Sequence, residues 1–307
     1  MFTMLALLFQ NQTSINRKVS SIITLMVLVL VCAGCAGRNR PITPASGPIS
    51  IESIERDGPV RGFVARIDLT DPRVRIRVVP ATPDDPDGDG PCVTRLDKVQ
   101  AIASRNQFDL AINASFFIAP ASREIFGKTL HYFVSNPAFP LGWLMSNSRI
   151  VSRPQQHPSP AIVVFDDDRV EITTDLIDMP TNAREAVSGS EMLVNNAQVV
   201  ARDSPQQHPR TAAGLSADRT ELILVVIDGR RENWSHGVTL RELGAMMIEL
   251  GANDAINLDG GGSSTMVERV SDGNYRILNR PSDGSEINPS FSIPRAVSDA
   301  LGVQISP

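Results

Sequence analysis

The chain has few aromatic residues and no excess of positive charge. Only 5% of its 307 residues are aromatic, so an extended stacking platform for a long glycan is not expected. The formal net charge is −5, which gives no electrostatic reason to expect nucleic acid binding. Each tryptophan could stack on a sugar, although Trp143 lies in an apolar segment and is expected in the core. Trp234 lies in a polar loop, so it could belong to a binding site or could simply be exposed.

Several catalytic and metal-binding motifs are also missing. The sequence has no Gly-x-Ser-x-Gly nucleophile elbow, and no Walker lysine follows its run of three glycines, so nucleotide cleavage is not expected. The acidic loop 84–89 resembles a calcium loop only faintly, because it lacks the twelve-residue spacing and the closing glutamate. A solvated turn is the simpler interpretation. We therefore predict no cofactor and no metal.

The first 35 residues are typical of a bacterial export signal. Arg17 and Lys18 precede the apolar run 22–31, and Ala33-Gly34-Cys35 resembles the end of a lipobox. A signal anchor is the alternative, but the run is shorter than the roughly 20 residues that span a bilayer. We predict a lipoprotein signal peptide (1–35), a tether (36–48) and one domain (49–307). Cys35 would carry the lipid on a bacterial envelope membrane, the periplasmic side of the outer membrane in a diderm cell.

Lipidation would also remove most of the cysteine from the mature protein. With Cys32 cleaved off and Cys35 acylated, Cys92 is the only cysteine left. An intrachain disulfide is then impossible, so the core must stabilise the domain.

A strand, a helix and a second strand are predicted between residues 221 and 259. The near-continuous apolar run 221–227 is typical of a strand that is buried on both faces, and it ends at Asp228. Thr-x-x-Glu from Thr239 is a capping box, and Gly251 is placed to end the helix. The pattern predicts a right-handed crossover between parallel strands, which would bring Asp228 and Asp259 to one sheet edge.

Period-two and helical patterns elsewhere complete the predicted fold. Residues 74–78 alternate apolar residues with arginine, and a helix at 96–106 leads into a strand at 110–113 that delivers Asn113 to the same edge. Hairpins are expected at 161–173 and 191–200. The fold class is α+β: a single domain with a mixed, largely buried β-sheet flanked by helices.

The glycine-rich segment that follows Asp259 carries the most chemical information. Glycines allow positive φ and a close approach of the backbone to a ligand, and successive N–H groups in such a turn can bind an anion. The hydroxyl residues Ser263, Ser264 and Thr265 follow directly. A lone triple glycine is often only a mobile turn, but the flanking strand and carboxylate favour a binding site.

Five segments, in order, resemble the phosphodiester glycosidase family. The resemblance covers roughly residues 50–305, and its most specific part is Asp-Gly-Gly-Gly-Ser-Ser. One departure is visible: Ala114-Ser115 stands where the family often has two glycines, so we expect the turn to persist with slightly altered pocket walls. The matching segments are Asn113–Phe117, Arg210–Gly214, Val226–Arg230, the helix from Thr239, and Asn257–Thr265.

The resemblance implies a hydrolase that cleaves a glycosyl-1-phosphodiester, or a related glycosidic bond, in envelope or extracellular polysaccharide. Glycosidases generally use two carboxyl groups, and here the candidates are Asp228 and Asp259. Arginine forks suit a phosphate, and the amides and hydroxyls suit a sugar. The predicted substrate-binding residues are Asn113, Arg210, Arg230, Asn257, Gly260, Gly261, Ser263 and Ser264.

The sequence is also compatible with two other functions. The chain could be a non-catalytic glycan-binding lipoprotein of the same fold. It could also be a phosphodiesterase that breaks P–O instead of C–O, which would normally need a metal cluster that the sequence does not show. The predicted partners are a carbohydrate or sugar-phosphodiester substrate and the membrane, through the lipid anchor, but not nucleic acid.

Overall fold

A computed structural model describes residues 38–41, 47–82, 85, 90–125, 128–155, 158–270, 273–283 and 290–306. The chain divides into two compact units, Met1–Arg38 and Asn39–Pro307, and nearly all described residues belong to the second. The predicted signal peptide, Cys35 and most of the tether lie outside the described residues, as does most of the acidic loop 84–89. No helix within the described ranges is long and apolar enough to cross a membrane.

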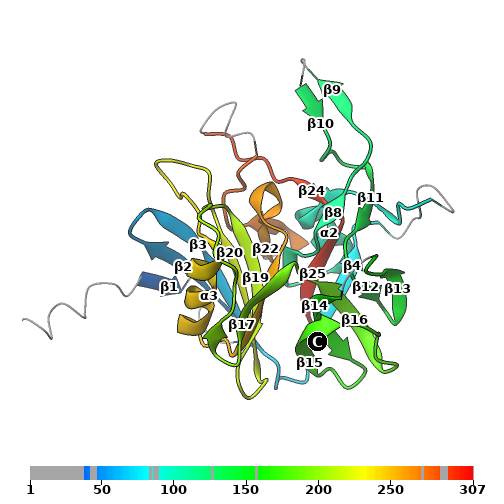
Figure 1. The fold of residues 1–307 in the computed structure, drawn as a ribbon, viewed down its shortest axis with the longest axis vertical. Coiled ribbons are helices and arrows are strands. Elements are labelled where there is room, and N and C mark those ends of the chain that lie inside the picture. The colour runs from blue at the N-terminus through cyan, green and yellow to red at the C-terminus, as the bar shows by residue number, and fades with distance from the viewer. Residues whose placement is uncertain are drawn as a thin grey trace, which may run out of the picture. The chain divides into compact units, whose positions relative to one another are not determined.

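The fold is mostly β: 48% of it is strand and 9% is helix. Two α-helices occur in the described part of the chain, α2 (Val99–Asn106) and α3 (Leu240–Glu249). Apart from the pairing of β1 with β2, every strand pairing of the described sheets is antiparallel. The predicted mixed sheet flanked by helices is therefore wrong, and several antiparallel sheets replace it (Figure 1).

The largest sheet has eight strands in the order β1-β2-β3-β20-β19-β21-β17-β18. Helix α3 lies against one face of it. Its strands are β1 (Arg38–Pro41), β2 (Ile49–Arg56), β3 (Val60–Asp68), β17 (Glu191–Asn195), β18 (Gln198–Val199), β19 (Arg210–Leu215), β20 (Glu221–Ile227) and β21 (Asp254–Leu258).

Two five-stranded sheets complete the main body, in the orders β23-β22-β7-β25-β4 and β13-β12-β16-β14-β15. The first contains β4 (Val74–Pro80), β7 (Leu110–Asn113), β22 (Met266–Arg269), β23 (Tyr275–Ile277) and β25 (Asp299–Ile305). The second contains β12 (Leu144–Ser146), β13 (Arg149–Ser152), β14 (Ser159–Phe165), β15 (Val170–Leu176) and β16 (Ala183–Ser188).

Short pairings and one helical turn make up the rest, and the β9–β10 hairpin projects at the top of Figure 1. These elements are β5 (Thr94–Arg95), β6 (Asp97–Lys98), β8 (Phe117–Ile118), β9 (Arg123–Ile125), β10 (Lys128–Leu130), β11 (Pro137–Pro140), β24 (Ala296–Val297) and the 3-10 turn η1 (Gly261–Ser263).

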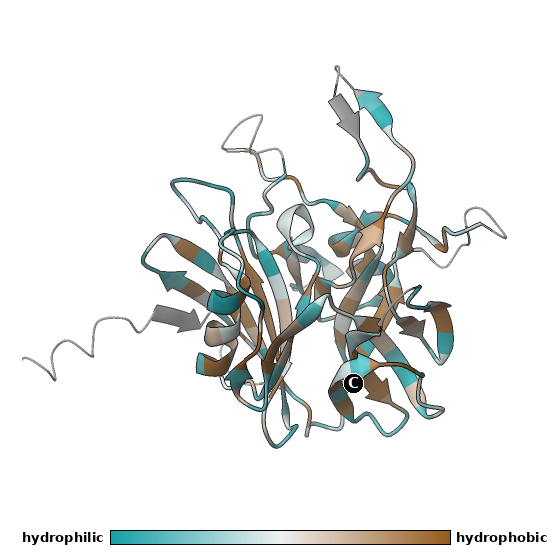
Figure 2. Cartoon of the chain, viewed as in Figure 1, coloured by the Kyte–Doolittle hydropathy of each residue, from teal (hydrophilic) through white to brown (hydrophobic). Residues whose placement is uncertain are grey.

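The apolar run 221–227 forms strand β20, and both faces of this strand are covered by other parts of the protein. Alternate residues of the strand point to opposite faces. Leu222, Leu224 and Val226 pack in the core shared with the two five-stranded sheets, while Ile223 and Val225 pack beneath α3. Both faces are therefore buried, as the continuous apolar run predicts, and Figure 2 shows the hydrophobic residues concentrated in these inner strands.

The predicted connection from β20 through α3 to β21 is correct in its elements but not in its pairing. The capping box of Thr239 and Glu242 is present, and Gly251 has φ +99° just beyond the helix. However, β19 lies between β20 and β21 and is antiparallel to both. The two strands run in the same direction but do not pair with each other. An apolar run predicts that both faces of a strand are buried, but it does not predict the direction of the neighbouring strand.

Candidate active site

Strands β20 and β21 end at the same edge of the eight-stranded sheet, as predicted. Arg210, at the start of β19, pairs with the last residue of β20, and Thr211 pairs with the last residue of β21. Asp228 and Asp259 therefore leave this edge on either side of β19. Two inter-strand spacings separate the strand ends, which amounts to about 10 Å.

Asn113 is buried at the end of β7 and connects this edge to the glycine-rich segment. Its Oδ1 accepts hydrogen bonds from Thr211 Oγ1 (2.9 Å) and the Thr265 N–H (3.1 Å), and its Nδ2 donates to the Asp259 carbonyl (2.6 Å). The side chain is fully buried. Asn113 thus holds both ends of the segment from Asp259 to Thr265, and these contacts use its amide within the protein.

Asp228 is 1% exposed, and protein donors occupy both of its carboxylate oxygens. Oδ1 accepts from Asn279 Nδ2 (3.0 Å) and the Arg280 N–H (2.8 Å), and Oδ2 accepts from Trp234 Nε1 (2.8 Å). Burial raises the pKa of Asp228, although these donors and Arg231 oppose the shift. Because Asn279 also donates to the Ser264 carbonyl (2.9 Å), Asp228 is coupled to the glycine-rich segment.

Two guanidinium groups flank the glycine-rich segment. Gly261 has φ +64°, and a Cβ at this position would lie 3.1 Å from Nη2 of Arg230. A Cβ at Gly262 would overlap the carboxylate of Asp283 and the guanidinium of Arg295. Glycine is therefore required at both positions, once for conformation and close approach and once for space.

Arg230 and Arg295 differ in how the protein holds them. Arg230 is exposed and adopts a left-handed backbone conformation with φ 59°. No hydrogen bond or ion pair of its guanidinium is found within the described ranges. Arg295 forms a two-pronged ion pair with Asp283 (2.8 and 2.9 Å), and its guanidinium lies 4.1 Å from the ring centre of Tyr132. Sequence reasoning named Arg230 but missed Arg295, Asp283 and Tyr132.

Asp259 is the carboxyl group at the centre of this arrangement. Its backbone is fixed by a hydrogen bond from its N–H to the Ala114 carbonyl (2.9 Å), and the residue remains partly accessible to solvent. Burial among protein atoms raises its pKa to about 7, and the charge of Asp299 adds to the shift, while Ser263, Arg295 and the Gly260 N–H oppose it. A carboxyl with a pKa near neutrality suits proton transfer in catalysis.

Three buried hydroxyl groups follow the glycines. The oxygens Ser263 Oγ, Ser264 Oγ and Thr265 Oγ1 make no hydrogen bond of ordinary geometry within the described part of the chain, although Ser263 lies near enough to Asp259 to affect its pKa. Asn257 Oδ1 is likewise unpaired, while its Nδ2 donates to Ser190 Oγ (2.9 Å). Unpaired buried polar atoms are rare, so this group indicates a place for water or a ligand.

A cavity of about 510 Å³ adjoins this region. Ser190, the partner of Asn257, lies in its lining with Gly189 and with Phe116, which comes from the segment that begins at Asn113. Leu141 and Arg153 also line this cavity. A volume of this size can hold a small organic ligand.

Arg210 and His208 lie together beside Arg230. The Nε of Arg210 donates to the Val238 carbonyl (3.1 Å) and its Nη2 to the Gln206 carbonyl (3.2 Å). Burial lowers the pKa of His208, and the charges of Arg230 and Arg210 lower it further. The two guanidinium groups give this partly desolvated wall of the site its positive charge, and the imidazole beside them is neutral.

Both tryptophan side chains make contacts within the protein. Trp143 is 3% exposed within a core cluster, and its Nε1 donates to the Leu176 carbonyl (2.8 Å), so core packing is confirmed. The guanidinium groups of Arg61 and Arg280 lie over the ring of Trp234, 4.3 and 4.6 Å from its centre. In the described ranges, no group of three or more His, Cys, Asp or Glu side chains is arranged to hold a metal ion.

Comparison with known proteins identifies the family. The family model described as phosphodiester glycosidase matches residues 106–304, which include β7, β19, β20, β21 and the glycine-rich segment. The chain belongs to the phosphodiester glycosidase family. Over 98 residues it is also 39% identical to the SPbeta prophage-derived uncharacterized protein YomE of Bacillus subtilis (strain 168). That match covers 32% of this chain and only 13% of the relative's length.

Two solved structures share the fold of this chain. The catalytic domain of zebrafish N-acetylglucosamine-1-phosphodiester alpha-N-acetylglucosaminidase, solved in a form auto-inhibited by its pro-peptide, aligns with a TM-score of 0.60 and 20% identity, over 89% of this chain and 88% of that one. A putative exported protein from Burkholderia pseudomallei K96243 aligns with a TM-score of 0.55 and 16% identity, over 94% and 89%. At these identities the likeness establishes the fold alone.

Ala114-Ser115 stands at the one visible departure from the expected motif, and the serine makes specific contacts in this structure. The Ser115 N–H donates to Asp299 Oδ1 (2.8 Å), and its hydroxyl donates to Oδ2 of the same carboxylate. Ser298 Oγ also donates to Oδ2 (2.6 Å), and burial raises the pKa of Asp299. The serine therefore ties the turn after β7 to the start of β25, close to Asp259.

Proposed function

We propose that this protein hydrolyses a glycosyl-1-phosphodiester at the anomeric C–O bond, in envelope or extracellular polysaccharide. The observation that carries the proposal is the placement of Asp259: a partly accessible carboxyl with a pKa of about 7, beside a glycine-rich segment that two guanidinium groups flank. Membership of the phosphodiester glycosidase family supports the reaction class.

The arginines account for binding of the phosphodiester. A phosphodiester carries a negative charge and, as a leaving group, gains more charge when the C–O bond breaks. A guanidinium fork can form two parallel hydrogen bonds to such a group. Arg230 is the best placed for this role because it is exposed and carries no described ion pair, whereas Asp283 already holds Arg295. Arg210 contributes positive potential from beside the same edge.

Asp259 would transfer the proton. In its ionised form it accepts a proton from water while the water oxygen bonds to the anomeric carbon. The bond from that carbon to the phosphate oxygen breaks, and its electron pair leaves with a phosphomonoester, which the arginines stabilise. The products are a free sugar and a phosphomonoester, and Asp259 returns its proton to solvent. A pKa of about 7 keeps a useful fraction of this base ionised at neutral pH.

The sequence also predicts a catalytic role for Asp228, and that prediction stands untested. Its two oxygens are occupied by Asn279, Arg280 and Trp234, so the contacts support a positioning role better than direct proton transfer. The predicted binding role of Asn113 has the same status, since its amide already holds the glycine-rich segment.

Hydrolysis in isotopic water tests the reaction. The purified protein is incubated with UDP-N-acetylglucosamine and with a methyl-phospho-sugar in ¹⁸O-water. We expect free sugar that carries the label, because water attacks carbon. Label in the phosphate would instead identify a phosphodiesterase. Absence of turnover across a broad panel, together with measurable glycan binding, would identify a non-catalytic binding lipoprotein.

We also propose that Cys35 is lipidated and that the domain is tethered to an envelope membrane. The supporting features are the basic pair, the short apolar run and Ala33-Gly34-Cys35 in the sequence. Cys35→Ser is expected to move the protein from the membrane fraction to the soluble fraction, with Cys92→Ser as the control that stays at the membrane. Identical fractionation of parent and Cys35→Ser would refute lipid attachment.

A further inference from the structure

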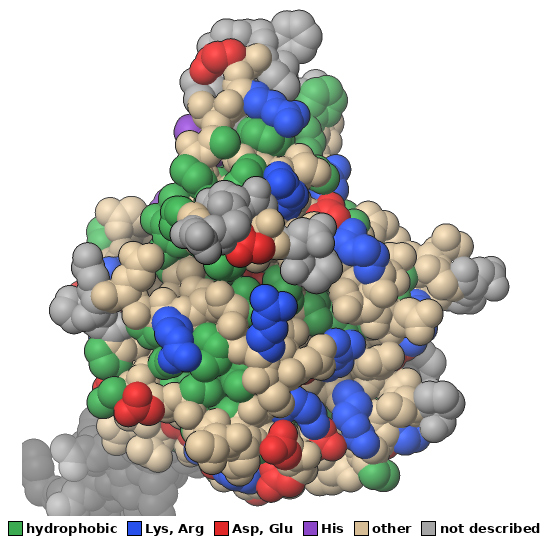
Figure 3. Space-filling model, turned by 90° about the vertical axis from the view of Figure 1, so that its right-hand side faces the viewer, with side chains coloured by type: hydrophobic (Ala, Val, Ile, Leu, Met, Phe, Trp, Pro, Cys, Tyr) green, Lys and Arg blue, Asp and Glu red, His purple; other side chains and the backbone are tan. Residues whose placement is uncertain are grey.

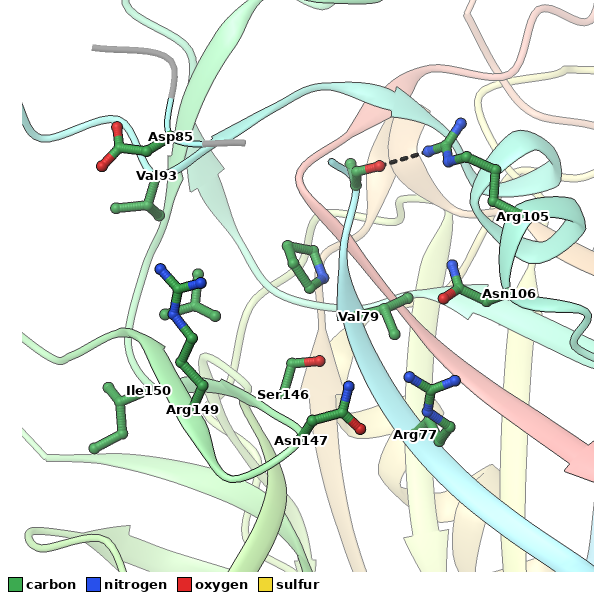
Figure 4. A pocket seen from close by; sticks show the side chains of 13 residues that line it. Arg77, Val79, Asp85, Val93, Arg105, Asn106, Ser146, Asn147, Arg149 and Ile150 are labelled. Atoms are coloured by element: carbon green, nitrogen blue, oxygen red, sulfur yellow. Dashed lines mark hydrogen bonds between the residues drawn. The ribbon is translucent and has the colours of Figure 1, made fainter. Parts of the chain in front are cut away.

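A second cavity of about 510 Å³ lies away from the glycine-rich segment. It is bounded by β4, by the end of α2 and by the β12–β13 hairpin (Figure 4). Its lining contains neither Asp259 nor Arg230 and no residue of the glycine-rich segment, so this cavity is distinct from the candidate active site.

Three arginines from three separate elements line this cavity: Arg77 from β4, Arg105 from α2 and Arg149 from β13. Figure 4 shows Arg149 on the left and Arg77 on the right of the space, with Ser146 and Asn147 between them. The one acidic lining residue is Asp85. Within the lining, positive charge therefore exceeds negative charge, although the whole chain carries a net charge of −5.

The three guanidinium groups are not equally committed to the protein. Arg105 is held by Asp97 (Nη1 to Oδ2, 2.6 Å) and donates from Nη2 to the Ala81 carbonyl, the dashed bond in Figure 4. Arg149 is exposed, and no hydrogen bond or ion pair of its guanidinium is found in the described ranges. Arg149 is thus available to an incoming ligand, while Arg105 shapes the wall.

Arg77 is held only loosely. Its Nε lies 3.9 Å from Oε1 of Glu185, too far for a hydrogen bond, and its guanidinium lies 5.8 Å from the ring centre of Phe108. Glu185 is fully buried, and Oε1 has no hydrogen-bond partner in the described part of the chain. Burial raises the pKa of Glu185 to about 7, so at neutral pH this carboxyl neutralises Arg77 only in part.

We propose that this cavity binds a small organic anion, a sugar or similar molecule that bears a phosphate, sulfate or carboxylate group. Arg149 and Arg77 bind the anionic group, because a guanidinium matches the oxygens of such groups. The apolar side chains of Val79, Ile150 and Val151 contact the uncharged part of the ligand. Figure 3 shows the side of the molecule on which β12 and β13 lie in Figure 1, and Lys and Arg side chains are spread over this face among a smaller number of Asp and Glu.

Binding by the full-length protein tests the proposal. Isothermal titration with glucose 6-phosphate, glucose 6-sulfate and glucuronate identifies which anionic group is bound. We expect saturable binding of at least one probe and a Kd that rises about tenfold or more in Arg149→Gln, the effect of losing a charge-assisted hydrogen bond. Because Arg149 is exposed, this variant should fold normally, and a thermal melt checks that it does.

Two control variants locate the bound anion. Arg73→Gln removes the same charge from the turn before β4 without touching the cavity, and it should leave the Kd unchanged. Arg230→Gln, at the glycine-rich segment, should also leave it unchanged. Absence of saturable binding for all three probes overturns the proposal. So does an equal loss in Arg73→Gln, or a loss in Arg230→Gln without a loss in Arg149→Gln.

The buried carboxyl provides a second readout. The charged groups that face Glu185 are Arg77 on β4 and Arg184 on its own strand, the latter also paired with Asp168 (2.6 Å). Ionised Glu185 competes with the ligand for Arg77, so affinity for glucose 6-sulfate, whose charge is constant in this range, should fall between pH 6 and pH 8. Glu185→Gln should remove that dependence. An unchanged pH profile in this variant would contradict the role of Arg77.

Discussion

Replacing Asp259 with asparagine separates a catalytic carboxyl from a structural one. Ionising Asp259 in the folded protein is unfavourable, because burial raises its pKa from 3.8 to about 7. An amide has nearly the same shape and does not ionise. The variant should therefore lose turnover while it gains stability at alkaline pH, a combination that a structural turn residue would not produce.

The magnitude follows from the pKa shift. The unfolded carboxyl is ionised at both pH 5 and pH 8, whereas the folded carboxyl is mostly protonated at pH 5 and ionised at pH 8. The folded state therefore binds the proton more tightly, and the parent's stability falls as pH rises toward 7. Two pKa units between pH 5 and 7, at 1.36 kcal/mol each, amount to about 3 kcal/mol. Asp259→Asn should escape this loss.

Thermal melts at pH 5 and pH 8, measured beside the kinetics, provide the assay. We expect the Tm of Asp259→Asn relative to the parent to rise by several degrees between the two pH values. The turnover number should fall by about 10²–10⁴-fold, as for a lost general base. In the parent, kcat/KM should increase with pH through an inflection near 7.

Asp228→Asn is the contrasting variant. Its amide would place a donor against Trp234 or Asn279, which already donate to this side chain, so it should be less stable than the parent at both pH values. If Asp259→Asn behaves in the same way, or if it retains near-parental turnover, Asp259 is a structural residue and the proposed site is wrong at its centre.

Three other substitutions test the surroundings of Asp259. Arg230→Lys should raise KM for a phosphodiester by about tenfold with little change in Tm, because a point charge cannot replace a fork; an unchanged KM would remove Arg230 from phosphate binding. Gly262→Ala should abolish activity and lower the Tm, since its Cβ overlaps Asp283 and Arg295, and a normal melt with full activity would show that the loop adapts. Asn113→Ala should cost about 2–4 kcal/mol in urea unfolding because three buried hydrogen bonds are lost, and a cost below 1 kcal/mol would contradict its role as a clamp.

Much of the local structure was predictable because its signals are local. The run 221–227 becomes β20 with the predicted bounds, residues 110–113 become β7, and the alternation at 74–78 becomes a strand with buried valine and isoleucine. The helix after Thr239 begins at its capping box. Each of these follows from side-chain periodicity or from a hydrogen bond between residues three apart.

The candidate site was predictable only in part. The sequence predicted Asp228, Asp259 and Arg230 as site residues because they directly follow predicted strands or a glycine. It missed Asp283, which pairs with Arg295 in a segment about 30 residues beyond the glycines. An arginine that follows a proline in a loop carries no periodic or capping signal, so only its position in the fold shows that it lies near Asp259.

The sequence by itself determined that a buried strand, a capped helix and a glycine-rich turn follow one another, since each depends on nearby residues. Only the tertiary structure decided that β19 lies between β20 and β21, because burial on both faces of a strand is the same beside a parallel or an antiparallel neighbour. It also decided the chemistry of the carboxyls. Ser115 and Asp299 are 184 residues apart, and the desolvation of Asp259 comes from segments that meet only in the folded chain. Hydrogen bonding and burial are properties of that meeting, so a linear pattern does not encode them residue by residue.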